Sequence, residues 1–495
     1  MVQDTQVDTP LNIFLVSSEV SPLAQTGGLG QVCGSLPPAL AGLGLKVTAV
    51  MPLYRSVDRQ AHGLRPTSLG LSVPLAGWRI ASRVWRGDLD GCPLYLLANE
   101  DMFGRAALYG GSQGDYPDNA LRFTFLCRGA VELARALGQP VDVVHVHDWQ
   151  TALLPAYMAT RPFDLGPLQD AASLLTIHNL AFQGRFRRDL FRVTGLPASL
   201  DTMAGAELWG DVSFLKAGLV SADALSTVSP SYAQEIQTPA GGMGLDGVLR
   251  TREKDLYGIL NGADYAVWSP ENDPHLPATY SAADLSGRTL CRQGLLEAFE
   301  LPPAPEDTPI LGFVGRLTEQ KGLSLILMAA PAMLARGLRL LVLGTGAPWS
   351  EQALMDLARG HPGRVGLKLT YSEPLAHLMQ GGCDIMLMPS SFEPCGLNQM
   401  YAMRYGAAPL VHATGGLKDT VTPFDPASGQ GTGFVFAPYA VVPLLAALEQ
   451  ALGVWAQPRQ WRRLMANAMA QDFSWGVSAR AYAALYRRLK TRKRA

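Results

Sequence analysis

Short apolar runs, each bounded by Gly, Pro or Asn, recur along the chain with helix-length segments between them. Runs of this kind are typical of parallel strands that are buried on both faces. In the first half of the chain they cover residues 12–17, 47–51, 93–98, 141–147, 173–177 and 224–228. The alternation predicts an α/β fold with a doubly wound parallel sheet, in which ligands bind at the loops that follow the strands.

The same rhythm begins again after Asn261 and predicts a second Rossmann-like domain. Its strands are expected at residues 309–314, 338–343, 365–369, 384–388 and 408–412. Stretches rich in proline and acidic residues, 268–277 and 301–309, are expected to be connecting loops. We therefore predict one domain at residues 1–261 and a second at residues 262–471.

The last segment, residues 472–495, has the pattern of an amphipathic helix. Trp475, Ala479 and Tyr482 recur on one face of it, so the helix needs a surface to cover. Its basic end, residues 487–494, is interpreted as a solvated and fraying helix end without a function of its own.

Composition narrows the class of protein. The chain has 495 residues, of which 48% are hydrophobic and 17% charged, and this favours a globular protein of two or more domains. Lys and Arg total 41 against 42 Asp and Glu, so no overall charge recruits nucleic acid or an anionic membrane. The longest apolar segment, residues 322–334, is too short to span a bilayer.

Cysteine usage and the N-terminus point to a cytoplasmic protein. The six cysteines form no CxxC pair and no metal-ligand spacing, which favours reduced thiols and no bound metal. The first ten residues are acidic and polar, whereas a secretory signal needs a basic start and an apolar stretch. We therefore expect the chain to remain in the cytoplasm.

The loop after the first predicted strand is rich in glycine, with the sequence TGGLG at residues 26–30. Gly27 and Gly28 would let backbone amides approach a phosphate or a sugar closely. A tight strand-to-helix turn explains the same glycines equally well. The motif gains weight only from its position after the first strand.

Two cations follow the first strand of the second domain. Arg316 comes at the strand end, and Lys321 falls five residues later, near the start of a helix. A guanidinium and an ammonium placed there suit a pyrophosphate, because they can neutralise its oxygens as the leaving group departs. The alternative is a pair of unrelated surface charges.

A single carboxylate, Glu393, follows another apolar strand of the second domain. A carboxylate at such a strand end can stabilise the oxocarbenium-like centre that forms when a sugar is transferred with retained configuration. Taken alone, Glu393 would more often be a helix-capping or solvated residue. Thr414, Gly415 and Gly416 follow the next strand and offer backbone amides as a further anion-binding loop.

Histidines lie at two strand ends of the first domain. His178 can hydrogen-bond a sugar hydroxyl. His145 and His147 are interpreted as pointing to opposite faces of their strand, which argues against a metal site, and one of them as a packed structural histidine. Tyr109, Trp149 and Phe182 are candidate platforms for sugar rings, although aromatic residues near strand ends are more often core.

Taken together and in order, these motifs resemble those of bacterial glycogen synthases and plant starch synthases. The motifs are TGGLG, HVHDWQT, TIHNLAFQG, SADALSTVSPSYAQEI, NGADYAVWSP, GFVGRLTEQKG, PSSFEPCGLNQMYAMRYG and TGGLKDTV. The resemblance runs nearly end to end. It implies a GT-B fold: two Rossmann-like domains of doubly wound parallel sheets that face a cleft, and a C-terminal helix that crosses back to the first domain.

The resemblance also implies an activity. The expected reaction transfers glucose from ADP-glucose to the non-reducing end of an α-1,4-glucan such as glycogen, without a cofactor or a metal. Arg316 and Lys321 are expected at the donor phosphates, and Glu393 and His178 at the donor glucose. Further substrate contacts are expected from residues that match the family motifs: Gln25, Gly27, Gly28, Tyr109, Asp148, Asn179, Cys395, Gly396, Leu397, Thr414, Gly415 and Gly416.

The first loop departs from the family pattern. That pattern is Lys-Thr-Gly-Gly-Leu, a small residue and Asp, but this chain has Gln25 and Gln31 at the two charged positions. A neutral amide keeps a hydrogen bond but no charge, so the hold on the donor phosphates is open to change. A smaller departure is Ser391, where the family usually has Arg.

Two other functions stay open at this stage. One is a glucan-binding homologue with little turnover, which the neutral Gln25 and Gln31 motivate. The other is a retaining transferase that uses UDP-glucose or a small acceptor. Polysaccharide binding without transfer would support the first alternative, and donor competition would distinguish the second.

Overall fold

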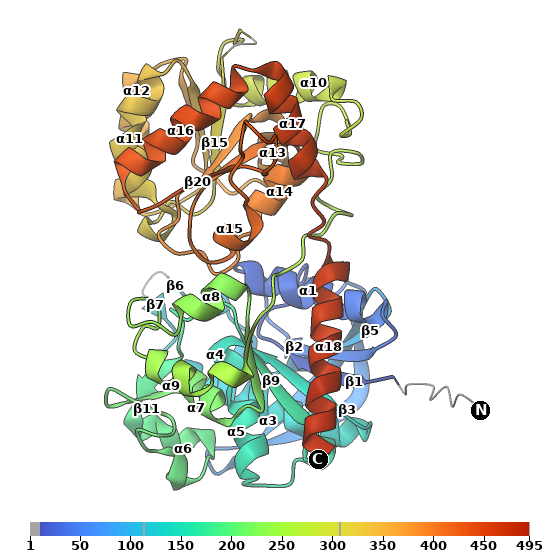
Figure 1. Ribbon diagram of the computed structural model, residues 1–495. Helices are drawn as coiled ribbons and strands as arrows, with labels where there is room; N and C mark the ends of the chain where they lie inside the picture. The colour runs from blue at the N-terminus through green and yellow to red at the C-terminus, as the bar shows by residue number, and fades with distance from the viewer. Residues whose placement is uncertain (1–9, 112–113, 306–307, 495) are drawn as a thin grey trace, which may run out of the picture. The chain divides into compact units, whose positions relative to one another are not determined.

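The computed structural model describes residues 10–111, 114–305 and 308–494, so the secretory-signal argument, which rests on the first ten residues, falls almost wholly outside the described part. The chain divides into two compact units (Figure 1). Unit 1 contains the chain up to Val228, residues 233–262 and the C-terminal segment from Trp475. Unit 2 contains residues 229–232 and 263–474.

Unit 1 is built on a nine-stranded sheet with the order β14-β13-β9-β8-β1-β2-β5-β4-β3. Six strands lie where the apolar runs predict them: β1 (Asn12–Val16), β2 (Lys46–Pro52), β5 (Cys92–Ala98), β8 (Val143–His147), β9 (Ala172–Ile177) and β13 (Ala224–Thr227). These strands and β14 (Leu256–Gly258) pair in parallel. The prediction of a doubly wound parallel sheet is confirmed for unit 1.

An antiparallel hairpin at the edge of this sheet is absent from the prediction. It consists of β3 (Arg65–Leu75) and β4 (Trp78–Leu89). Its strands alternate between buried and exposed positions, so they contain no continuous apolar run. The turn between them places Ala76 and Gly77 at φ values of 51° and 84°, as a tight hairpin turn requires.

Helices pack against the unit 1 sheet in two groups. α1 (Gly28–Ala41) and α18 (Trp475–Arg494) contact each other. α3 (Asn119–Leu137), α5 (Leu153–Thr160) and α7 (Phe214–Ser221) form the second group. The C-terminal helix α18, dark red in Figure 1, runs back along the strands of the first unit, as the sequence predicts. Its predicted inner face is buried.

The basic end of α18 is largely exposed, as interpreted, but ion pairs tie it to the sheet, so it is not a fraying end. Lys490, Arg492 and Lys493 each form an ion pair with an aspartate that directly precedes a strand of the sheet. The partners are Asp142, Asp255 and Asp223, at 2.9, 2.6 and 3.0 Å. The cations also lie in the last turns of a helix, where the helix dipole favours positive charge.

Unit 2 contains a six-stranded parallel sheet with the order β17-β16-β15-β18-β19-β20. Five strands agree with the prediction to within a residue or so: β15 (Ile310–Val314), β16 (Arg339–Leu343), β17 (Val365–Lys368), β18 (Ile385–Met388) and β19 (Ala408–His412). The sixth, β20 (Phe434–Phe436), is too short to stand out in the sequence. This strand order is that of the classic Rossmann fold.

Two helical groups accompany the unit 2 sheet. One group is α11 (Leu323–Ala335), α12 (Pro348–Gly360) and α16 (Val441–Trp455). The other is α10 (Ser286–Ala298), α13 (Glu373–Gly382), α14 (Asn398–Arg404) and α17 (Pro458–Met469). Residues 259–285 form no helix or strand, in agreement with the predicted connecting loop at 268–277.

Candidate active site

Three post-strand loops meet at one edge of the unit 2 sheet. They follow β15, β18 and β19, which are neighbours in the sheet. β15 is the strand at which the order reverses, because the chain passes from it to β16 on one side and returns to β18 on the other. Ligands of open α/β sheets bind at such a switch point, beyond the carboxyl ends of the strands.

Lys321 and Glu393 form the charged centre of this edge. Lys321 lies in a short 3₁₀ turn before α11, and its Nζ is 2.5 Å from Oε2 of Glu393. The Ser390 hydroxyl donates to the same carboxylate oxygen at 3.0 Å. Glu393 is 9% exposed, so its negative charge is held mostly inside the protein and directed by these two partners.

Backbone contacts fix the three loops against one another. A side chain at Gly322 would place its Cβ 2.1 Å from the Pro389 carbonyl oxygen, and one at Gly415 would come 2.0 Å from the Glu393 carbonyl oxygen. Both glycines have positive φ, at 83° and 44°. The Gly416 amide donates to the Glu393 carbonyl at 3.1 Å. The glycine loop therefore supports the backbone of Glu393 directly.

The remaining predicted residues of unit 2 lie around this centre. Arg316 is exposed, two residues beyond the end of β15. Cys395 is buried and Gly396 has a φ of 73°, and the Gln399 side chain donates to both of their carbonyls at 3.0 and 3.2 Å. Leu397 directly precedes α14, and Thr414 directly precedes α15 (Gly415–Thr420).

In unit 1, the glycine loop is held by a buried carboxylate. Glu19, which is 2% exposed, accepts the Thr26 amide at 2.6 Å and the Thr26 hydroxyl at 2.7 Å. The Tyr109 hydroxyl donates to the same carboxylate at 2.6 Å. Gln25, Gly27 and Gly28 are exposed, and a Cβ at either glycine would meet nothing within 4 Å. The loop therefore has an open side at Gly27 and Gly28.

No motif in the sequence marks Glu19 as a residue of the site. It lies three residues beyond β1 in a stretch without a motif of its own. A carboxylate directly after the first strand, ahead of a glycine loop, is the one signal that points to it.

The histidines of unit 1 form a buried chain, and the interpretation that His145 and His147 point to opposite faces is wrong. Residues two apart on a strand share a face, and these two rings lie 4.1 Å apart. His147 Nδ1 is 3.0 Å from His178 Nε2. A sugar contact from His178 would therefore use its other ring nitrogen, Nδ1.

His145 is the packed structural histidine that the sequence predicts, because both of its ring nitrogens contact hydroxyl groups of the protein. Its Nδ1 is 2.7 Å from the Tyr486 hydroxyl of α18, and its Nε2 is 2.7 Å from the Thr176 hydroxyl. Burial lowers the pKa of His145 and of His178 to about 3, and lowers the pKa of His147 well below its ordinary value. All three rings are therefore neutral at pH 7.

Asp148 directs the loop that carries His178. It follows β8 with a φ of 54°, and its Oδ1 accepts the His178 amide at 2.7 Å. Burial raises the pKa of Asp148 to about 7, the amides of His178 and Asn179 lower it, and the nearby Glu19 charge raises it. Asn179 turns the same loop, because its side chain accepts the Ala181 amide at 3.0 Å.

The aromatic candidates separate into core and surface. Trp149 is 8% exposed and packs edge-on against Phe123, so it belongs to the core. Tyr109 is committed to Glu19. Phe182 is 55% exposed and lines an open cavity of about 510 Å³. Only Phe182 of the three presents an open ring face.

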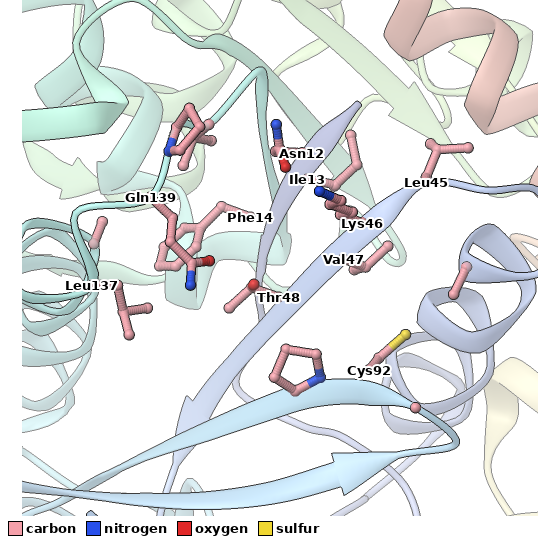
Figure 2. A pocket seen from close by; sticks show the side chains of 16 residues that line it. Asn12, Ile13, Phe14, Leu45, Lys46, Val47, Thr48, Cys92, Leu137 and Gln139 are labelled. Atoms are coloured by element: carbon pink, nitrogen blue, oxygen red, sulfur yellow. The ribbon is translucent and has the colours of Figure 1, made fainter. Parts of the chain in front are cut away.

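A second cavity, of about 310 Å³, lies at the opposite ends of the strands (Figure 2). Asn12 and Lys46, which begin β1 and β2, line it together with Thr48, Cys92, Gln139 and apolar side chains. In α/β sheets of this kind ligands bind beyond the carboxyl ends, so this cavity is not the active site.

The described residues contain no group of three or more His, Cys, Asp or Glu side chains arranged to hold a metal ion. All six cysteines lie in the described part of the chain, are buried and form no disulfide. Within the ranges that the structure covers, no helix is long and apolar enough to cross a membrane.

Comparison with known families agrees with this arrangement. Residues 12–251 match the starch synthase catalytic domain, and residues 297–464 match the glycosyl transferases group 1 domain. A sucrose-phosphate synthase from Thermosynechococcus elongatus shares the fold at 18% identity, with a TM-score of 0.58 over 97% of this chain and 99% of its own. Two Rossmann-like units with these domains define a retaining glycosyltransferase of the GT-B fold.

The relatives at higher identity specify the family. A glycogen synthase of Anaeromyxobacter sp. is 48% identical over 97% of this chain and 99% of its own. One of Myxococcus xanthus is 45% identical over 96% and 99%. The catalytic domain of starch synthase IV from Arabidopsis thaliana, bound to ADP and acarbose, matches at 32% identity with a TM-score of 0.90, over 98% of this chain and all of its own. The chain belongs to the glycogen and starch synthase family.

Proposed function

We propose that this protein transfers glucose from ADP-glucose to the non-reducing end of an α-1,4-glucan, with retention of configuration and release of ADP. The observation that supports it most is the Lys321–Glu393 pair, set among the loops at the switch point of unit 2. The family relationship over nearly the whole chain supports the substrates. We assign the nucleotide of the donor to unit 2 and the acceptor glucan to unit 1.

The charges of the site suit the departure of a nucleoside diphosphate. When the bond between the sugar C1 and the phosphate oxygen breaks, negative charge develops on the diphosphate. Arg316 is exposed and available to it as a fork of donors, and Lys321 adds a point charge. Two cations can neutralise the leaving group as magnesium does in other transferases, so we propose that no metal or other cofactor takes part.

Glu393 stabilises the sugar side of the same bond. Positive charge develops at C1 as the leaving group departs, and a carboxylate favours that charge electrostatically. Because Lys321 and Ser390 both contact Oε2, Oε1 is the oxygen that we assign to the sugar. His178, neutral at pH 7, would hydrogen-bond a hydroxyl of the donor glucose through Nδ1.

The test is transfer of labelled glucose into glycogen by the purified full chain, with ADP-glucose and UDP-glucose compared side by side. We expect incorporation from ADP-glucose and its loss in Glu393→Gln, which keeps the shape of the side chain and removes its charge. Preference for UDP-glucose would overturn the donor assignment. Glycogen binding with no incorporation from either donor would overturn the synthase and indicate a glucan-binding homologue.

The Gln25→Lys variant tests the departure in the first loop. If the missing charge weakens the hold on the donor phosphates, the variant will lower the KM for ADP-glucose and leave the KM for glycogen unchanged. Equal KM values for ADP-glucose in both proteins would show that Gln25 does not face the donor.

We also propose that the protein acts in the cytoplasm and binds neither nucleic acid nor membranes. Six cysteines without a disulfide favour a reducing compartment. The balance of 41 basic and 42 acidic residues offers no net charge to a polyanion. Fractionation of the cells that express it would test this location.

A further inference from the structure

A hairpin in unit 1 exposes a tryptophan on unfavourable backbone. Trp209 joins β11 (Glu207–Leu208) to β12 (Asp211–Ser213) and is 65% exposed. Trp209 and Gly210 have φ values of 56° and 85°, the pattern of a two-residue hairpin turn that favours Asn, Asp or Gly at its first position. The turn does not require a large aromatic side chain at this position. An exposed bulky residue on strained backbone points to a function.

The surroundings hold the Trp209 ring in place. The Arg185 guanidinium lies 5.0 Å from the ring centroid and is itself paired with Asp211 at 2.8 Å. On another side the ring lies against Gly244, where a Cβ would come within 2.2 Å of it. Only glycine permits this approach, and its φ of 84° would strain any other residue. The tryptophan is therefore fixed and not merely exposed.

Trp209 and Phe182 line the same open cavity of about 510 Å³, a size within the range of ~300–1,000 Å³ of small-ligand sites. Its polar lining includes Gln183 and Arg185. The walls are tied together, because Gln183 donates to the Met243 carbonyl at 3.1 Å. Two open aromatic rings among hydrogen-bonding groups match the chemistry of a sugar chain, which has apolar faces and a rim of hydroxyls.

One loop of unit 1 carries both His178 and part of the cavity lining. Phe182 and Gln183 follow His178 by four and five residues, in the loop after β9. A glucan whose end lies near His178 would extend over this loop. The charged side chains in the cavity lining are Arg185, which Asp211 neutralises, and Asp115.

We propose that Trp209 and Phe182 form an aromatic subsite that binds the α-glucan acceptor several glucosyl units from its reacting end. The subsite rests on the proposed function, because that function makes a glucan the acceptor. Trp209 is a binding residue of this subsite and takes no part in the chemical step. The subsite acts on long acceptors more than on short ones.

The test variant is Trp209→Asn, because Asn suits the turn and removes the ring without disturbing the fold. We expect its Kd for maltoheptaose and for glycogen, measured without donor, to rise about three- to tenfold, the size of one lost aromatic contact. Its KM for glycogen should rise likewise, while the KM for ADP-glucose and the activity with maltose as acceptor stay unchanged.

Trp78→Ala is the matched control, because Trp78 is 77% exposed on β4 and lies outside the cavity. Unchanged glucan affinity in Trp209→Asn, or an equal loss in Trp78→Ala, would overturn the subsite. Weaker binding in Trp209→Asn together with no transfer by the wild-type chain would overturn the proposed function and leave the subsite standing. Normal transfer by the wild-type chain together with unchanged glucan binding in Trp209→Asn would overturn the subsite and leave the proposed function standing.

Discussion

The buried histidine chain of unit 1 should make this unit sensitive to acid. His145, His147 and His178 are neutral in the folded protein, because burial lowers the pKa of each far below its ordinary value of 6.5. In the unfolded chain the same side chains bind a proton below about pH 6.5. Between pH 6.5 and the folded pKa values the unfolded state therefore holds more protons, and the free energy of unfolding falls as the pH falls.

The size of the effect follows from the two sets of pKa values. Between pH 7 and pH 5 each histidine destabilises the fold by about 2 kcal/mol, or about 6 kcal/mol for three. Asp148 acts in the opposite direction, since burial raises its pKa from 3.8 to about 7 and the folded state takes up its proton first. Its contribution is about 2 kcal/mol in favour of the fold at pH 5. The net expectation is a loss of about 3–4 kcal/mol.

Asp142 and Asp255, two of the aspartates that pair with α18, contribute little in this range of pH. Hydrogen bonds with Asn12 and Lys490 outweigh burial and lower the pKa of Asp142, and the ion pair with Arg492 lowers that of Asp255. Both groups start from an ordinary value of 3.8 and therefore titrate below pH 5. These two aspartates therefore do not offset the effect of the histidines between pH 7 and pH 5.

The assay is a urea titration at pH 7 and at pH 5, followed by pulsed hydrogen exchange of peptides that contain β8 and β9. Asp148→Asn is the matched variant, because an amide oxygen still accepts the His178 amide but does not titrate. This variant should lose about 6 kcal/mol over the same range, about 2 kcal/mol more than the wild type. Equal stability of the wild type at the two pH values, or an identical loss in both proteins, would refute the reasoning.

Two substitutions test the packing around the site. Gly415→Ala puts a Cβ 2.0 Å from the Glu393 carbonyl oxygen at a φ of 44°, so kcat should fall by at least about tenfold; Gly453→Ala, whose Cβ meets nothing within 4 Å, should keep full activity. Wild-type kcat in both would contradict the support that Gly415 gives to Glu393. Tyr486→Phe leaves a buried nitrogen of His145 without its partner, and the urea titration should show a loss of about 1–3 kcal/mol. A loss under about 0.5 kcal/mol would mean that the hydroxyl is dispensable.

The parts of the fold that the sequence predicts are those with continuous apolar runs. Strands such as β15 and β18 are buried along nearly their whole length and contain only apolar residues, so the run marks the strand. The hairpin β3–β4 and the three-residue β20 give no such run. Half-exposed and very short strands therefore need a different signal from the one that finds a parallel core.

The sequence predicts the charged side chains of the candidate site but not the residues that hold its loops in place. Motif order identifies Lys321 and Glu393, and the structure joins them at 2.5 Å. The order of the motifs does not identify Glu19, because its role depends on the positions of Thr26 and Tyr109 in the folded chain. The expectation that His145 and His147 point to opposite faces is wrong for a different reason. Side chains two residues apart on a strand share a face, so the sequence alone already places both on one face.

The support from Glu19 bears on the two neutral amides of the first loop. Thr26 is fixed through its amide and its hydroxyl by Glu19, and neither bond involves Gln25 or Gln31. The conformation of the loop therefore does not depend on the charges that the family carries at those two positions. Its glycines keep an open side in their absence. What the exchange removes is a Coulombic attraction to an anionic ligand, which changes the affinity for the donor and leaves the scaffold for transfer in place.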